Sequence, residues 1–150
     1  EFQGYLNIGI GYTLPFEVFA AEWIDADALK ARLDSYNLHG VAFRTIHFKP
    51  FSGSLQGKLI HGVQFHYTDY EAACCTLTQF YVMQAVNELY PDRNPFALSK
   101  GRNNMFDKVC GTDYVRTAFG KRLKVEDIAD YWSKDVEAFR KLSKKYWIYN

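Results

Sequence analysis

The sequence has 150 residues, of which 48% are apolar and 17% aromatic, and its formal net charge at pH 7 is +1. A chain of this length is expected to form one domain and to bury about two-thirds of its unfolded surface. The near-neutral charge excludes a general electrostatic attraction to nucleic acid or to membranes. No apolar run approaches the roughly 18 residues that span a bilayer, and no signal peptide is visible. Because the sequence begins without methionine, we expect a fragment or a processed product.

The first predicted elements are a short strand over residues 4–10 and a short helix over residues 15–23. Pro15 fits the first turn of that helix, where its missing N–H costs nothing. Between the two elements, Gly9 and Gly11 predict a tight turn with positive φ. Such a turn would place the next carboxylate, Glu17, in the first turn of the helix and orient its side chain from there.

The same two glycines resemble the front of a nucleotide-binding Gly-x-Gly-x-x-Gly loop. Leu14 stands where the third glycine is required, and no βαβ unit follows. A nucleotide-binding function is therefore not predicted.

The middle of the sequence predicts one helix and two strands. Residues 24–40 have helical periodicity, with Asp25 or Asp27 as the candidate N-cap. Residues 41–50 and 58–69 alternate in a β-rich composition, and the loop between them is too long for a tight hairpin.

The C-terminal half is predicted to be mainly helical. Residues 69–90 form the longest apolar-rich helix, buried on more than one side, and residues 91–104 are irregular. Thr112 is the candidate N-cap of the next helix, and a last helix places Ile128, Trp132, Phe139 and Leu142 at helical spacing. The whole pattern predicts an α+β fold, with a small mixed or antiparallel sheet of about three to four strands and helices packed on one side.

The cysteines and histidines do not predict a metal site. Cys74 and Cys75 are adjacent rather than at Cys-x-x-Cys spacing, and the four histidines have no ligand spacing. The three cysteines are interpreted as core thiols, although a disulfide from Cys110 to one of the adjacent pair stays possible. We predict no cofactor and no metal.

Several stretches, in one order, resemble a known bacterial family: NIGIGYTLPFEVFAAEWIDADAL, GVAFRTIHFKP, GVQFHYTD, ELYPD, FDKVCGTD and KKYWIYN. The order is similar to that in the C-terminal part of the NamZ-type exo-β-N-acetylmuramidases, long catalogued as a domain of unknown function. The resemblance implies that residues 1–150 are one auxiliary domain. A Rossmann-like N-terminal catalytic domain would complete the enzyme, with the active site in the cleft between the two domains.

The resemblance also assigns candidate site residues. The family stretch Gly-x-Gly-x-Thr-x-Pro-Phe-Glu ends at Glu17 in this sequence, which makes Glu17 the candidate catalytic residue. Many relatives have arginine where Ile10 stands, so another cation must meet an anionic sugar here. The candidate substrate-binding residues are Asn7, Gly9, Gly11, Tyr12, Thr13, Arg44, Lys49 and Arg102.

The activity implied is the release of non-reducing terminal N-acetylmuramic acid from muropeptides or other peptidoglycan-derived sugars. The implied location is periplasmic or secreted, and the implied partner is the N-terminal catalytic domain, with no nucleic acid and no membrane span. The partner surface should form an apolar patch around Tyr12, Leu14, Phe16 and Phe51. The alternative is a non-catalytic carbohydrate- or protein-binding module.

Overall fold

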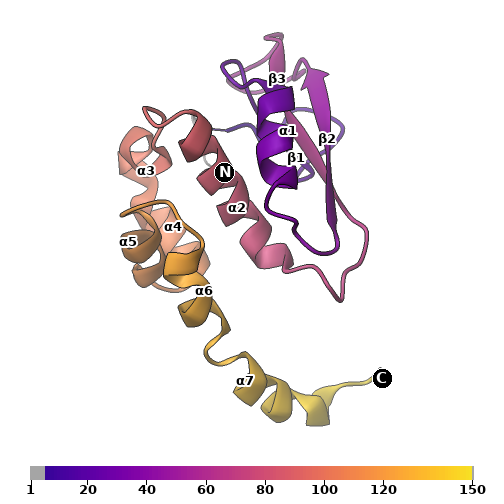
Figure 1. The fold of residues 1–150 in the computed structure, drawn as a ribbon, viewed down its shortest axis with the longest axis vertical. Helices are drawn as coiled ribbons and strands as arrows, with labels where there is room; N and C mark the ends of the chain where they lie inside the picture. The colour runs from indigo at the N-terminus through magenta and orange to yellow at the C-terminus, as the bar shows by residue number, and fades with distance from the viewer. Residues whose placement is uncertain (1–5, 150) are drawn as a thin grey trace.

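The structure is a computed structural model and describes residues 6–149. Three strands come early in the chain, and helices make up most of the remainder (Figure 1). In chain order the elements are β1 (Val18–Ala21), α1 (Ala26–Asp34), β2 (Val41–Phe48), β3 (Ile60–Tyr67), α2 (Cys75–Leu89), α3 (Pro95–Leu98), η1 (Lys100–Arg102), α4 (Asn103–Cys110), α5 (Tyr114–Phe119), α6 (Glu126–Ser133), α7 (Val136–Ser143) and η2 (Lys144–Tyr146). None of the helices described is long and apolar enough to cross a membrane.

The sheet is antiparallel throughout, in the order β1-β3-β2. The central strand places Gln64 opposite Val18 on one side and opposite Arg44 on the other. The predicted α+β class and the predicted small sheet are confirmed.

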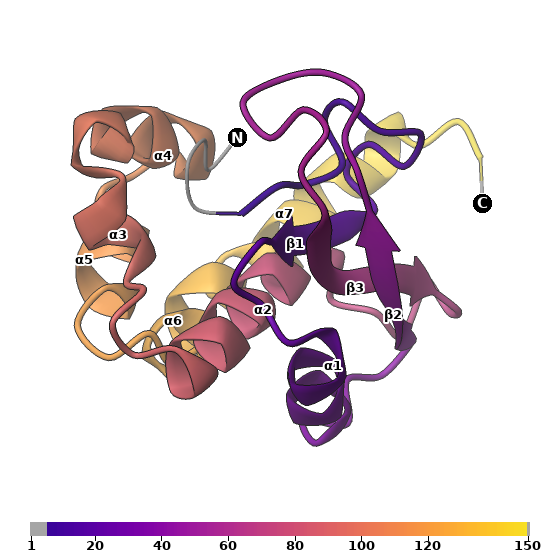
Figure 2. The same cartoon turned by 90° about the horizontal axis from the view of Figure 1, so that it is seen from above.

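Helices α1 and α2 cover one face of the sheet (Figures 1 and 2). The fully buried side chains of this layer are Leu29, Leu33, Val63, Val82, Ala85 and Val86. Loops rather than helices cover the opposite face of the sheet. There, Tyr12, Leu14 and Leu55 pack on buried residues of the three strands. The expected placement of helices on one side of the sheet is therefore confirmed.

The far side of α2 packs against the C-terminal helices. Phe80 and Met83 lie with Val115, Phe119 and Ile128 in a second apolar cluster. The predicted burial of this helix on more than one side is confirmed, and α2 joins the sheet layer to the helical layer (Figure 2).

The prediction of a helix over residues 15–23 is wrong. β1 occupies the centre of this range and pairs along its whole length with β3. Phe16 has a φ of +66°, and this value is incompatible with a helix that starts at Pro15. Pairing with a central strand outweighs the local helical preference of this segment. Of the strand predicted over residues 4–10, the part within the described residues forms one bridge, from Asn7 to Ala20.

Two further predictions need correction. The segment 91–104 is not irregular, because it contains α3, η1 and the start of α4. The predicted last helix is divided into α6 and α7. Ile128 is buried in the helical cluster and Trp132 packs against it, whereas Phe139 and Leu142, predicted on the same stripe, are exposed.

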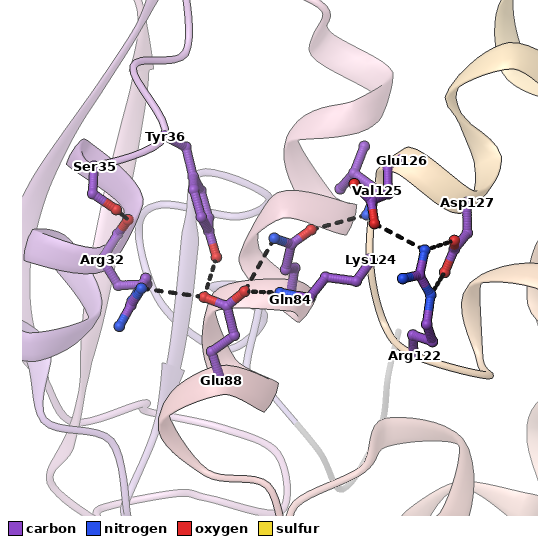
Figure 3. Close-up of polar contacts among 10 residues, drawn as sticks. All are labelled: Arg32, Ser35, Tyr36, Gln84, Glu88, Arg122, Lys124, Val125, Glu126 and Asp127. Carbon is purple, nitrogen blue, oxygen red and sulfur yellow. Dashed lines mark hydrogen bonds and ion pairs between the residues drawn. The ribbon is translucent and has the colours of Figure 1, made fainter.

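A polar cluster around Glu88 holds the two layers together (Figure 3). The Glu88 carboxylate accepts hydrogen bonds from the Tyr36 hydroxyl at 2.8 Å and from Gln84 Nε2 at 3.1 Å. It also pairs with Arg32 at 3.5 Å and closely with Lys124. Burial would raise the pKa of Glu88, but the hydrogen bonds from Lys124, Tyr36 and Gln84 outweigh it and leave this pKa below its ordinary value.

Candidate functional site

The glycine turn before β1 depends on backbone conformations that favour glycine. Gly9 and Gly11 have φ values of +85° and +82°. A Cβ at Gly9 would overlap the carbonyl oxygen of Leu14, and one at Gly11 would overlap the carbonyl oxygen of Ser52. The predicted positive-φ turn is confirmed, and it is packed directly against the β2–β3 loop.

Phe16 is the strained residue of this turn. Its φ of +66° is unusual for an aromatic side chain, yet its amide donates a 2.7 Å hydrogen bond to the carbonyl of Ile8 that fixes the conformation. The ring is 66% exposed, so the strain is not compensated by burial of the ring. Strain of this kind often accompanies a functional constraint.

Glu17 lies immediately before β1 and reaches the central strand. Gln64 Nε2 donates a hydrogen bond to Glu17 Oε2 at 3.0 Å, and Arg44 Nε donates to Gln64 Oε1 at 2.6 Å. Because a guanidinium only donates, the Gln64 amide directs its oxygen to Arg44 and its nitrogen to Glu17. The expectation that a helix N-terminus directs Glu17 is wrong. A buried glutamine, 3% exposed, positions it instead.

Three predicted site residues take structural or peripheral positions. Asn7 closes the turn, since its Oδ1 accepts from the Gly9 amide at 2.7 Å and its Nδ2 donates to the Ile10 carbonyl at 3.2 Å. Tyr12 stacks on Phe48 with ring centroids 4.3 Å apart, so much of the ring packs against the protein. Thr13 is exposed at the outside of the turn.

The expected apolar patch is present in part. Phe16 and Phe51 are largely exposed, and the Phe51 amide donates to the Gly11 carbonyl at 2.7 Å, which brings the two loops together. Tyr12 and Leu14 instead pack against the loop-covered face of the sheet.

A cavity of about 840 Å³ lies between β1, α2 and the η1–α4 segment, and Glu17 itself is not among its lining residues. Arg102 lines this cavity, whereas Arg44 and Lys49 do not. Phe16 and Val18, on either side of Glu17, also line it. Ser99 lines it as well.

Ser99 is a feature of this cavity that the sequence analysis missed. Within residues 6–149, its Oγ is the buried side-chain polar atom that lacks a hydrogen-bond partner. Buried hydroxyl groups are normally paired, so this one is available to a ligand or to water. A serine in a polar loop segment carries no sequence signal that could have indicated this position.

The cysteines and histidines form no metal centre in the described part of the chain, where no group of three or more metal-ligating side chains occurs. All three cysteines are free thiols, and Cys74 and Cys75 are exposed rather than core residues. Burial, together with the negative charge of Asp107, raises the pKa of the Cys110 thiol. The Cys110 thiol is thus poorly suited to nucleophilic chemistry.

Comparison with known proteins supplies the family. Over residues 2–149 the chain matches the family described as "Exo-beta-N-acetylmuramidase NamZ, C-terminal". The chain belongs to this family. The peptidoglycan β-N-acetylmuramidase NamZ of Bacillus subtilis (strain 168) is 38% identical over 144 residues, which are 96% of this chain and 34% of that protein.

A crystal structure of a relative shows the same fold. A DUF1343 family protein from Bacteroides fragilis NCTC 9343, solved at 1.65 Å, is 46% identical and superposes with a TM-score of 0.94. The superposition covers 99% of this chain and 39% of the other chain. This NamZ-type chain thus spans between a third and two-fifths of the length of these two relatives.

One stretch behind the NamZ resemblance has a structural explanation. Asp107 accepts hydrogen bonds from Arg116 Nε and Nη2 at 2.7 and 2.8 Å, which ties α4 to α5. Gly111 ends α4 with a φ of +73°. In the same stretch, Phe106, Val109 and Cys110 line the cavity.

Gln64 is the second residue that sequence reasoning missed. The alternation of β3 placed Val63 and Phe65 on the helix-covered face, so Gln64 had to lie on the other face. A polar residue on a central strand is a signal for a buried hydrogen-bonded position. Which partners it has could not be read from the sequence.

Proposed function

We propose that this chain is the C-terminal part of an exo-β-N-acetylmuramidase that acts on peptidoglycan-derived sugars. The whole enzyme releases non-reducing terminal N-acetylmuramic acid outside the cytoplasm, in the periplasm or after secretion. This chain contributes one wall of the active-site cleft, and an N-terminal catalytic domain contributes the other. The observation that carries the proposal is the Glu17 carboxylate, oriented by Gln64 and placed in the chain between Phe16 and Val18, which both line the cavity.

The geometry around Glu17 suits one of the two carboxyl roles in glycoside hydrolysis. Such enzymes generally use a proton donor and a second carboxylate that acts as a base or nucleophile or stabilises charge. Glu17 accepts a hydrogen bond from the Gln64 amide, which fixes the direction of its carboxyl group. We therefore assign Glu17 to base or positioning work, and the proton donor to the N-terminal domain.

The lactyl carboxylate of N-acetylmuramic acid needs a cation or a set of N–H donors. Arg102 lines the cavity, while Arg44 is bound to Gln64 and Lys49 is exposed after β2. Arg102 is thus the cation assigned to the lactyl group. The unpaired Ser99 hydroxyl in the same cavity would form a hydrogen bond with a polar group of the sugar.

The test is Glu17→Gln in the longer protein that contains this chain as its C-terminal part. The amide keeps the size of the side chain but removes a base, so kcat on a chromogenic muramoside should fall by about 10²-fold or more. Glu22→Gln is the matched control, because Glu22 is an exposed glutamate at the other end of β1, paired with Lys58. Unchanged kcat in Glu17→Gln would exclude a catalytic role for the glycine turn and favour the non-catalytic binding module.

A further inference from the structure

The chain ends in an arm that leaves the rest of the molecule. The arm consists of α7, η2 and residues 147–149, and Figure 1 shows it pointing away from both layers. Its large apolar side chains are exposed: Val136, Phe139, Leu142, Tyr146, Trp147, Ile148 and Tyr149. An exposed apolar surface of this density marks an interaction site.

The exposed apolar groups lie on more than one side of the arm. Val136, Phe139 and Trp147 line a hollow of about 660 Å³ together with Tyr131 and Trp132 of α6. The remaining apolar residues of the arm, Leu142, Tyr146, Ile148 and Tyr149, do not line that hollow. An amphipathic helix such as α7 normally buries its apolar stripe against other protein.

The arm cannot be stable as a helix by itself. α7 has eight residues, and isolated helices shorter than roughly 12–15 residues are marginal in water. Its helical state therefore depends on tertiary packing, of which the described residues supply only the contact with α6 at the hollow.

The occupant is indicated by the family relationship. The matched family is the C-terminal part of longer proteins, and the crystallised relative has 61% of its chain outside the superposed region. That superposition covers 99% of this chain, so the arm has its counterpart in a structure where further protein is present. We propose that the arm packs into an apolar groove on the N-terminal domain of the same polypeptide and fastens the two domains together.

Charge adds a requirement for that groove. Residues 134–145 carry five basic and two acidic side chains: Lys134, Arg140, Lys141, Lys144 and Lys145, with Asp135 and Glu137. The groove is therefore apolar at its base and bordered by carboxylates. α7 has one apolar stripe and several basic side chains, a pattern that a membrane surface would also accept, so vesicle binding is one arm of the experiment.

The experiment measures hydrogen exchange in the arm of the longer protein and of the present chain. In the longer protein the amides of residues 139–143 should exchange at least tenfold more slowly than in the isolated chain. Phe139→Asp should remove this protection. Ala138→Asp makes the same change of charge one residue away, at a position that does not line the hollow, and should leave it.

Each outcome decides the proposal. Equal exchange in the two proteins would overturn it, as would loss of protection in both variants. Protection that depends on concentration, with a doubled sedimentation mass, would assign the arm to a second copy instead. A shift of Trp147 fluorescence on phosphatidylglycerol vesicles, with vesicle binding by the longer protein, would assign it to a membrane. The proposal rests on the two-domain organisation in the proposed function, but the exchange measurement needs no enzymatic activity, so either can fail alone.

Discussion

At the scale of single residues, the strained Phe16 allows the proposed function of the glycine turn to be tested separately from its structural role. A left-handed conformation costs a side-chain-bearing residue roughly 1–2 kcal/mol, and glycine would avoid this at an entropic cost of about 0.5–1 kcal/mol. The ring is largely exposed and lines the cavity, so little packing would be lost.

We expect Phe16→Gly to leave the free energy of unfolding equal or slightly higher while lowering kcat/KM of the longer protein. Chemical denaturation and muramoside kinetics measure the two effects. Phe16→Ala is the control, since it removes the ring but keeps the strain, and it should be less stable than Phe16→Gly. A glycine variant with full activity would show that the ring has no part in the site.

Arg102 permits a test of the substrate's own charge. A charged hydrogen bond to the lactyl carboxylate contributes roughly 1.5–3 kcal/mol, so Arg102→Ala should weaken binding of a muramoside by this amount. Binding of the lactyl-free glucosamine analogue should be almost unaffected. Lys108→Ala is the control, because Lys108 is an exposed cation of α4 that does not line the cavity. An equal loss for both sugars would contradict the assignment.

At the scale of elements, the N-cap of α1 is a local feature with a measurable contribution. Asp25 Oδ1 accepts from the amides of Asp27 and Ala28, both at 3.0 Å. Asp25→Ala should destabilise the chain by about 0.5–2 kcal/mol, and Asp25→Asn should restore most of the loss, because asparagine caps equally well.

Denaturant unfolding of the present chain measures this difference. Asp27→Ala is the comparison, because Asp27 lies in the first turn of the same helix without a capping side-chain bond. Its loss should be smaller, limited to the interaction with the helix dipole. Equal losses in the two variants would show that charge, and not capping, stabilises this end of α1.

At the scale of the whole molecule, the Glu88 cluster couples the sheet layer to the helical layer. The Glu88 side chain is 19% exposed and meets Arg32 and Tyr36, at the C-terminal end of α1, and Lys124 before α6. Burial and the neighbouring Glu88 carboxylate raise the pKa of Tyr36. The neutral phenol and the ionised carboxylate thus stabilise each other near neutral pH.

The pH dependence of stability follows from these directions. Because the folded pKa of Glu88 lies below the ordinary value of 4.5, its contribution is present above pH 4.5 and is lost as pH falls through the lower folded pKa. We expect Glu88→Gln to lower the free energy of unfolding by about 1–2 kcal/mol at pH 7. This difference should shrink below pH 4.5.

Urea unfolding at several pH values between 3 and 8 tests this expectation. Asp34→Asn is the control, because Asp34 forms an exposed pair with Lys30 within α1, and such pairs contribute little. A difference between Glu88→Gln and the unchanged chain that stays constant down to pH 3 would contradict the linkage.

The sequence by itself determined the features that depend on neighbouring residues. The Asp25 cap follows from short-range hydrogen bonds, and β2 and β3 follow from alternation. The positive φ of Gly9 and Gly11 follows from the turn they occupy. The ordered motifs of the whole chain also indicated the NamZ family, which the comparison confirmed.

Only the tertiary structure decided the features that depend on distant residues. β1 is a strand because β3 pairs with it, although its own sequence favours a helix. Gln64 meets Glu17 across 47 residues of sequence and meets Arg44 from a third strand. The break before α7 separates a helix that packs in the core from one that does not. Periodicity and local propensity act within a few residues, whereas pairing partners and burial are set by contacts between segments far apart in the chain.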